Sequence, residues 1–74
     1  MNTTTAALVK QAARSMRFDN LEATEENVAR WSEWAQVGQV TSMADSTFSR
    51  FVKQVAKEVA AMVQEDADMA VIMR

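Results

Sequence analysis

The chain has 74 residues, a formal net charge of −2 and an isoelectric point of about 4.9. It contains no cysteine and no histidine, which excludes disulfides, thiolate metal sites and the imidazole that most often serves as a general base. It has no proline and a single glycine, so it lacks the turn residues that a β-rich domain needs. We therefore expect one all-α domain that spans residues 1–74, built as a small three-helix unit.

The first predicted helix runs from Thr4 or Thr5 to Arg17. Its apolar positions recur three and four residues apart, as on one face of an α-helix. They are Val9, Ala12, Ala13 and Met16. A connection follows, in which Phe18 and Leu21 are the apolar residues, and we expect both to anchor it to the core.

The second predicted helix begins after Thr24, whose hydroxyl can accept a hydrogen bond from a free backbone amide of the first turn. It is expected to run to about Val37, with Gly38 as its stop. Trp31 lies on the inward stripe of this helix, whereas Trp34 lies roughly 90° to the side. We therefore expect Trp31 in the core and Trp34 on the flank.

The third predicted helix spans residues 45–73 and carries heptad spacing. Its seam positions are Phe48, Val52, Val55, Val59, Met62, Asp66, Met69 and Met73. Nothing in the stretch around Asp66 breaks a helix, so we expect a cation from Lys10, Arg14 or Arg17 on an antiparallel neighbour to pair with it, or water to reach it. A continuous helix here would be about 43 Å long at ~1.5 Å per residue, against a globule about 30 Å across. The excess length predicts a homo-oligomer through helix 45–73.

The chemistry-bearing residues favour binding over catalysis. Two acidic clusters, at residues 22–26 and 65–68, lie at a helix start and on a solvated face, where a carboxylate pair has no pocket to shift its pKa. No glycine-rich phosphate loop is present. We expect no enzymatic activity, no cofactor and no bound metal.

Two kinds of apolar surface are candidates for contact with a partner protein. Tryptophan is a favoured anchor at interfaces, and the second helix carries two of them. Methionine at a chain end can form adaptable contact surface. The predicted protein-binding residues are Trp34, Trp31, Met69, Ile72 and Met73.

A helix-turn-helix is the alternative. In the twenty-residue window from Trp34 to Lys53, Val37 fills an inner-helix position and Gly38 falls where the two helices of the motif touch. The run from Ala44 to Lys53 resembles the recognition helix of many bacterial and phage repressors. The resemblance implies a DNA-facing set that comprises Ser46, Thr47, Ser49, Arg50, Lys53 and Gln54.

Small size, acidity, absent Cys and His and a helical build also resemble the accessory proteins of bacteriophages, which include anti-CRISPR proteins and inhibitors of host enzymes. This resemblance implies a stoichiometric protein binder that inhibits or modulates a larger complex, which is the leading interpretation. The alternatives are a dimeric helix-turn-helix regulator and a structural or assembly subunit. No apolar run is long enough to cross a bilayer and no signal peptide is visible, so we expect a cytoplasmic location.

Overall fold

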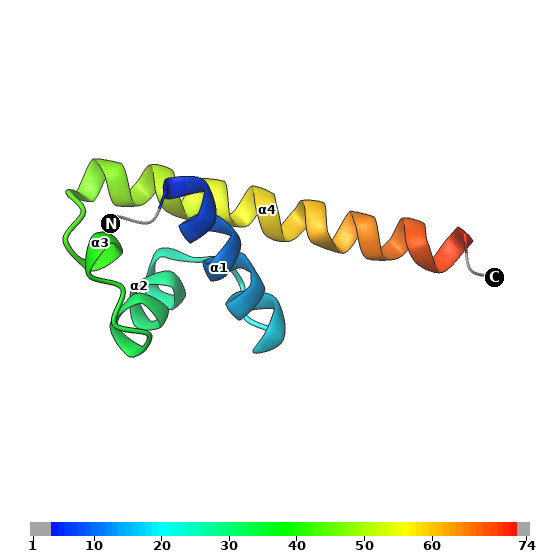
Figure 1. Ribbon diagram of the computed structural model, residues 1–74, viewed down its shortest axis with the longest axis horizontal. Helices are drawn as coiled ribbons and strands as arrows, with labels where there is room; N and C mark the ends of the chain where they lie inside the picture. The colour runs from blue at the N-terminus through cyan, green and yellow to red at the C-terminus, as the bar shows by residue number, and fades with distance from the viewer. Residues whose placement is uncertain (1–3, 73–74) are drawn as a thin grey trace.

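The computed structural model describes residues 4–72, with side chains for residues 4–67. This part of the chain is all-α and forms four helices, α1 (Thr5–Phe18), α2 (Glu25–Trp34), α3 (Gly38–Thr41) and α4 (Asp45–Ile72). In Figure 1, α1, α2 and α3 gather on one side of the first part of α4, and the rest of α4 extends beyond them. The predicted fold class is confirmed, with one short helix more than the three expected.

Side-chain caps start the first two helices, at Thr24 as predicted and also at Thr4, where no cap was predicted. The Thr4 hydroxyl accepts a hydrogen bond from the Ala7 backbone N–H at 3.2 Å, and the Thr24 hydroxyl accepts one from Asn27 N–H at 3.2 Å. Each bond satisfies one of the backbone donors that a helix start leaves without an intrahelical acceptor. The starts of α1 and α2 are therefore local properties of the sequence.

The ends of α1 and α2 share a second motif, in which a non-glycine residue adopts a left-handed conformation. Asn20 and Gln36 both have φ of 57°. The N–H of the following residue bonds back across the turn, from Leu21 to the Met16 carbonyl at 2.8 Å and from Val37 to the Ser32 carbonyl at 2.8 Å. These are the bonds of a Schellman motif.

The predicted stop at Gly38 is therefore wrong. The α2 helix ends at Trp34, and Gly38 instead begins α3, with a negative φ. The left-handed residue that turns the chain is Gln36. Glycine is the residue most often found in the left-handed conformation, because it has no Cβ to clash. Here Gln36 adopts that conformation, and Gly38, two residues farther along, does not end the helix.

The core lies between α1 and the first part of α4, with α2 and α3 closing its end. Small residues on α1, Ala12 and Ala13, are fully buried and allow the helices to approach closely. The one buried polar side chain among the described residues, Ser32, donates its hydroxyl to the Ala29 carbonyl at 2.8 Å. The buried apolar residues are Leu8, Val9, Ala12, Ala13, Met16, Val28, Trp31, Val40, Phe51, Val52 and Val55.

The α4 helix is continuous through Asp66, as predicted, and it makes the molecule elongated. The principal extents are 45 × 25 × 21 Å, and the radius of gyration is 13.2 Å. A compact chain of this length would have a radius of about 11 Å. The Arg17 guanidinium forms an ion pair with the Asp66 carboxylate at 2.5 Å, so one of the expected cations does reach the seam.

The direction of the neighbouring helix differs from the expectation. Lys10 shares a shallow hollow with Gln54 and Lys57, whereas Arg17, farther along α1, meets Asp66, farther along α4. The two helices therefore run in the same general direction and cross obliquely (Figure 1). The antiparallel arrangement expected for the pairing of Asp66 is wrong.

From Phe48 to Met62, the heptad seam packs against the chain's own core rather than against a second copy of the chain. Val52 and Val55 are buried, and Phe48, Val59 and Met62 pack against the same core. This part of the seam is not free to pair with a second copy. The side chains of Met69, Ile72 and Met73 lie outside the described part of the chain, so self-association through that end stays a prediction.

Candidate functional site

An apolar groove separates the end of α1 from α2, and we name it the Trp34 groove. Its volume is about 490 Å³. Both helices and the connection between them contribute to its walls. The lining residues are Met16, Phe18, Asp19, Leu21, Asn27, Arg30, Trp31 and Trp34.

Large apolar side chains stand exposed around this groove. Trp34 is 85% exposed, Phe18 is 91% exposed and Leu21 is 42% exposed. Full burial of a side chain the size of Phe is worth about 1.5–3 kcal/mol, and the fold does not gain that stabilisation at these positions. Exposed apolar patches of this kind are typical of contact surfaces.

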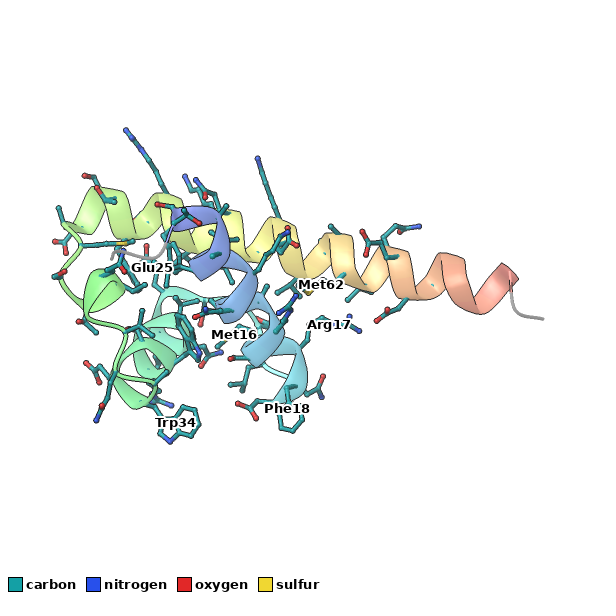
Figure 2. All side chains as sticks on the ribbon, viewed as in Figure 1. Met16, Arg17, Phe18, Glu25, Trp34 and Met62 are labelled. Carbon is teal, nitrogen blue, oxygen red and sulfur yellow. The ribbon has the colours of Figure 1, made fainter. Side chains whose placement is uncertain are left out.

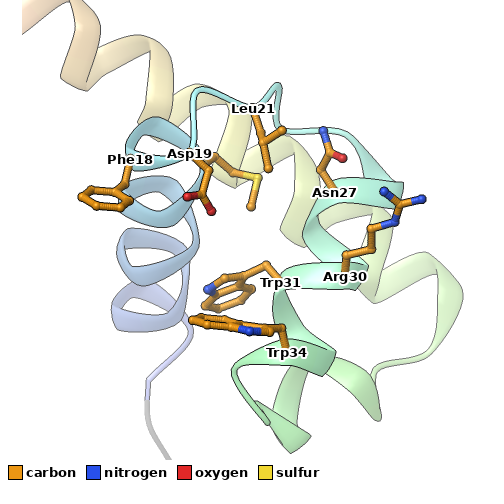
Figure 3. Close-up of a pocket in the computed structure, with 8 residues that line it drawn as sticks. Phe18, Asp19, Leu21, Asn27, Arg30, Trp31 and Trp34 are labelled. Carbon is orange, nitrogen blue, oxygen red and sulfur yellow. The ribbon is translucent and has the colours of Figure 1, made fainter.

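The two tryptophans divide as predicted. Trp31 is 8% exposed and belongs to the core, whereas Trp34 lies on the flank in water. Figure 3 shows both indoles on the α2 wall of the groove, with Asp19 directed toward them from the α1 side. Since Trp31 forms part of the wall while Trp34 forms the rim, only Trp34 has most of its surface available to a partner.

The prediction that Phe18 anchors the connection to the core is wrong. It is the last residue of α1 and projects outward from that helix (Figure 3). It also lines a second hollow, with Arg14, Arg17 and Met62, and so forms the crest between the two depressions. Its place outside the apolar stripe of the first predicted helix was the signal that could have shown its exposure.

Hydrogen bonds hold the end wall of the groove in place. The Leu21 N–H bonds to the Met16 carbonyl, and the Asn27 side-chain amide donates to the Glu22 carbonyl at 2.8 Å. The connection between α1 and α2 is thus bonded to the helix at each of its ends. A surface held in this way loses little conformational entropy when a partner binds.

Two charged side chains line the groove, and one of them, Arg30, is engaged in an ion pair. Arg30 forms an ion pair with Glu26 at 2.7 Å, with both side chains more than two-thirds exposed. A pair so exposed contributes little to stability. Asp19 is the only carboxylate among the lining residues. The groove is therefore a mainly apolar surface with few polar groups.

The DNA-facing residues predicted by the helix-turn-helix hypothesis fall on the first three turns of α4. Ser46, Thr47, Arg50, Lys53 and Gln54 are exposed. Ser49 is different, because it is half-buried and donates its hydroxyl to Glu25 Oε1 at 2.7 Å. This bond ties α4 to the start of α2, so Ser49 is not part of the outward-facing set.

The helix-turn-helix window itself is not formed. Its first helix would have to run from Trp34 to about Thr41, but α2 ends at Trp34 and α3 is a single turn. A Cβ added at Gly38 would meet nothing within 4 Å, so Gly38 does not sit at a contact between two helices. The later apolar positions, Phe48 and Phe51, do pack into the core as that reading expected.

The carboxylates that the sequence groups into clusters act singly in the structure. Glu25 accepts from Ser49, Glu26 pairs with Arg30, and Asp66 pairs with Arg17. Over the described residues, no three acidic side chains converge in a way that could hold a metal ion. In the same part of the chain, no helix combines the length and the apolar character needed to cross a membrane.

Comparison of the chain with protein-family models, with curated proteins and with solved structures found no significant match.

Proposed function

We propose that this protein is a non-catalytic binding module that holds a partner protein at the Trp34 groove and thereby inhibits or modulates a larger complex in the cytosol. This is the mode of action of phage accessory proteins of the anti-CRISPR kind. The observation that carries the proposal is the exposure of Phe18, Leu21 and Trp34 around one apolar groove.

The energetics of such a surface favour a protein partner. Aromatic side chains that become buried at the centre of an interface dominate its binding energy. Trp34 and Phe18 can each supply a large contact area with few rotatable bonds, and their helices are already ordered. Binding then buries apolar area at low conformational cost.

A small molecule fits the groove less well. Sites for small ligands enclose most of the ligand and present polar groups that fix its orientation. Here two of the three polar lining side chains are already engaged, because Asn27 bonds to Glu22 and Arg30 pairs with Glu26. Trp34 is 85% exposed, so this side of the groove is open to water rather than closed around a ligand.

The test is affinity capture from the native host with wild-type protein and with the double variant Phe18→Ser/Trp34→Ser. Both replaced side chains are exposed, so the free energy of unfolding should change by less than about 1 kcal/mol. We expect the variant to lose a specific protein partner that the wild type retains after nuclease treatment. Direct titration with the purified partner should then show binding at a one-to-one ratio.

The matched control is Val63→Ser, which removes an apolar side chain that is 52% exposed on α4, away from the groove. It should keep the partner. Equal capture by wild type and by the double variant would show that the groove is not the binding surface. Loss of every partner on nuclease treatment would contradict the protein-binding proposal itself.

A further inference from the structure

From residue 46 to residue 57, the side of α4 that faces away from the core carries cations and hydrogen-bonding side chains and no carboxylate. At about 100° per residue, its members fall within an arc of about 120°. We name this set the outer face of α4. It comprises Ser46, Thr47, Arg50, Lys53, Gln54 and Lys57, all of them exposed.

The charge on this face is not neutralised within the described part of the chain. Arg50, Lys53 and Lys57 form no ion pair with any described carboxylate, whereas Arg17 and Arg30 each have one. Lys10 of α1 adds a further cation at the edge, since it lines a hollow together with Gln54 and Lys57. Glu58 lines the same hollow and bounds the face on that side.

This concentration of cations stands out because the whole chain is acidic. Ten carboxylates against eight basic residues give a net charge of −2, yet no carboxylate occurs from residue 46 to residue 57. Like charges held on one helix face repel one another and are stabilised by an anionic partner. A ligand with regularly repeated negative charge would meet all three cations at once.

The shape of the face selects among polyanions. The outer face of α4 is exposed along its length, with α1 crossing the helix and α2 and α3 lying below it (Figure 1). An α-helix with its side chains is about 10–12 Å across, and the major groove of B-form DNA is about 12 Å wide. The major groove of duplex RNA is too narrow to admit a helix. Ser46, Thr47 and Gln54 add neutral hydrogen-bonding groups of the kind that contact phosphates and base edges.

We propose that the outer face of α4 binds duplex DNA, with the helix in the major groove and Arg50, Lys53 and Lys57 at the phosphates. No helix-turn-helix is required, because the face belongs to a single long helix that its own globule leaves uncovered. The Trp34 groove lies across the molecule from α4 (Figure 2). The DNA surface is therefore separate from the proposed protein-binding surface, and either can fail without the other.

The experiment is fluorescence anisotropy of a labelled 24-base-pair DNA duplex of mixed sequence, titrated with the full chain at 50 mM and 150 mM NaCl. With three phosphates neutralised, the logarithm of the association constant should fall with the logarithm of salt at a slope of about −2.7, which is about a twentyfold loss between these salts. Arg50→Glu/Lys53→Glu should weaken binding at 50 mM NaCl by at least tenfold.

The matched control is Arg14→Glu/Arg30→Glu, which changes the net charge by the same amount on other faces. It should weaken DNA binding by less than about threefold if the outer face, rather than bulk charge, is responsible. Circular dichroism on all variants verifies that the replaced residues, which are exposed, leave the helices intact.

Three results would overturn the proposal. Wild-type protein that leaves the anisotropy unchanged at 50 mM NaCl rules out the DNA surface. An equal loss in the two double variants shows an effect of net charge alone. Equal affinity for duplex RNA of the same sequence, or for poly-glutamate, shows a cationic surface that does not read the major groove and fits an acidic protein instead.

Discussion

The first and second parts of α4 carry the same apolar spacing and meet different surroundings. From Phe48 to Met62 the stripe is buried or half-buried against the chain's own α1 and α2. Beyond it, Val63 is 52% exposed, and Asp66 pairs with Arg17 at the end of α1 while its side chain stays 58% exposed. The first part of α4 thus packs into the core, whereas the second part extends beyond it into solvent. A heptad pattern predicts that a stripe will be covered, but the length of the neighbouring helices decides how far.

The sharpest way to test this contrast is to place a charge in each part. Val55 is fully buried, so Val55→Asp leaves an unpaired carboxylate in the core at a cost of about 4 kcal/mol or more. A domain of this size has little more stability than that, and we expect it to unfold. Val63→Asp should change the free energy of unfolding by less than about 0.5 kcal/mol. Urea denaturation followed by circular dichroism measures both. Similar losses for the two variants would mean that the second part of α4 is also packed.

Amide hydrogen exchange separates the two parts without any substitution. Backbone amides of residues 51–59 should open only with global unfolding, because they lie beneath α1 and α2. Amides of residues 65–71 should exchange with a free energy lower by about 2–4 kcal/mol, since little of the fold has to open with them. The measurement should be repeated at several protein concentrations. Protection of the second part that rises with concentration, together with a dimer in sedimentation, would confirm the predicted self-association through this end.

Met62 lies at the boundary between the two parts of α4. It is half-buried beside the end of α1. Met62→Ala should lower the free energy of unfolding by about 1–2 kcal/mol, below the usual range for truncation of a buried methionine, since the space is open to water. Met16→Ala, at a fully buried site on α1, should cost about 2–4 kcal/mol. A larger loss at Met62 than at Met16 would place the edge of the core farther along α4.

The smallest expected effect belongs to the pair of Arg17 with Asp66. Their side chains are 35% and 58% exposed, so solvent screens the interaction. A double-mutant cycle with Arg17→Ala and Asp66→Ala should give a coupling free energy of about 0.3–1 kcal/mol. Raising the salt concentration should reduce it. Coupling above about 2 kcal/mol would indicate that the pair, rather than apolar packing, holds the second part of α4 in its direction.

Several features of this protein were predictable from the sequence alone, because their causes are local. Thr4 and Thr24 mark helix starts since a hydroxyl three residues before a free amide can cap it. The helical period correctly divided Trp31 from Trp34, and the absence of glycine and proline around Asp66 predicted an unbroken α4. The ion pair at Asp66 followed because a carboxylate in an apolar seam needs a cation or water nearby.

Other features depended on contacts between residues far apart in the chain. Glu25 and Ser49 meet across 24 residues, and that bond turned a predicted DNA-facing serine toward α2. The chain turns after α2 at Gln36 rather than at Gly38, and Val40, two residues beyond Gly38, is buried in the core. A non-glycine residue can hold the left-handed conformation when the surrounding structure compensates for its cost. The Trp34 groove exists only because α1 and α2 diverge where Phe18 and Trp34 stand. Periodicity assigns a residue to one side of its helix, whereas the neighbouring helices determine whether that side is covered.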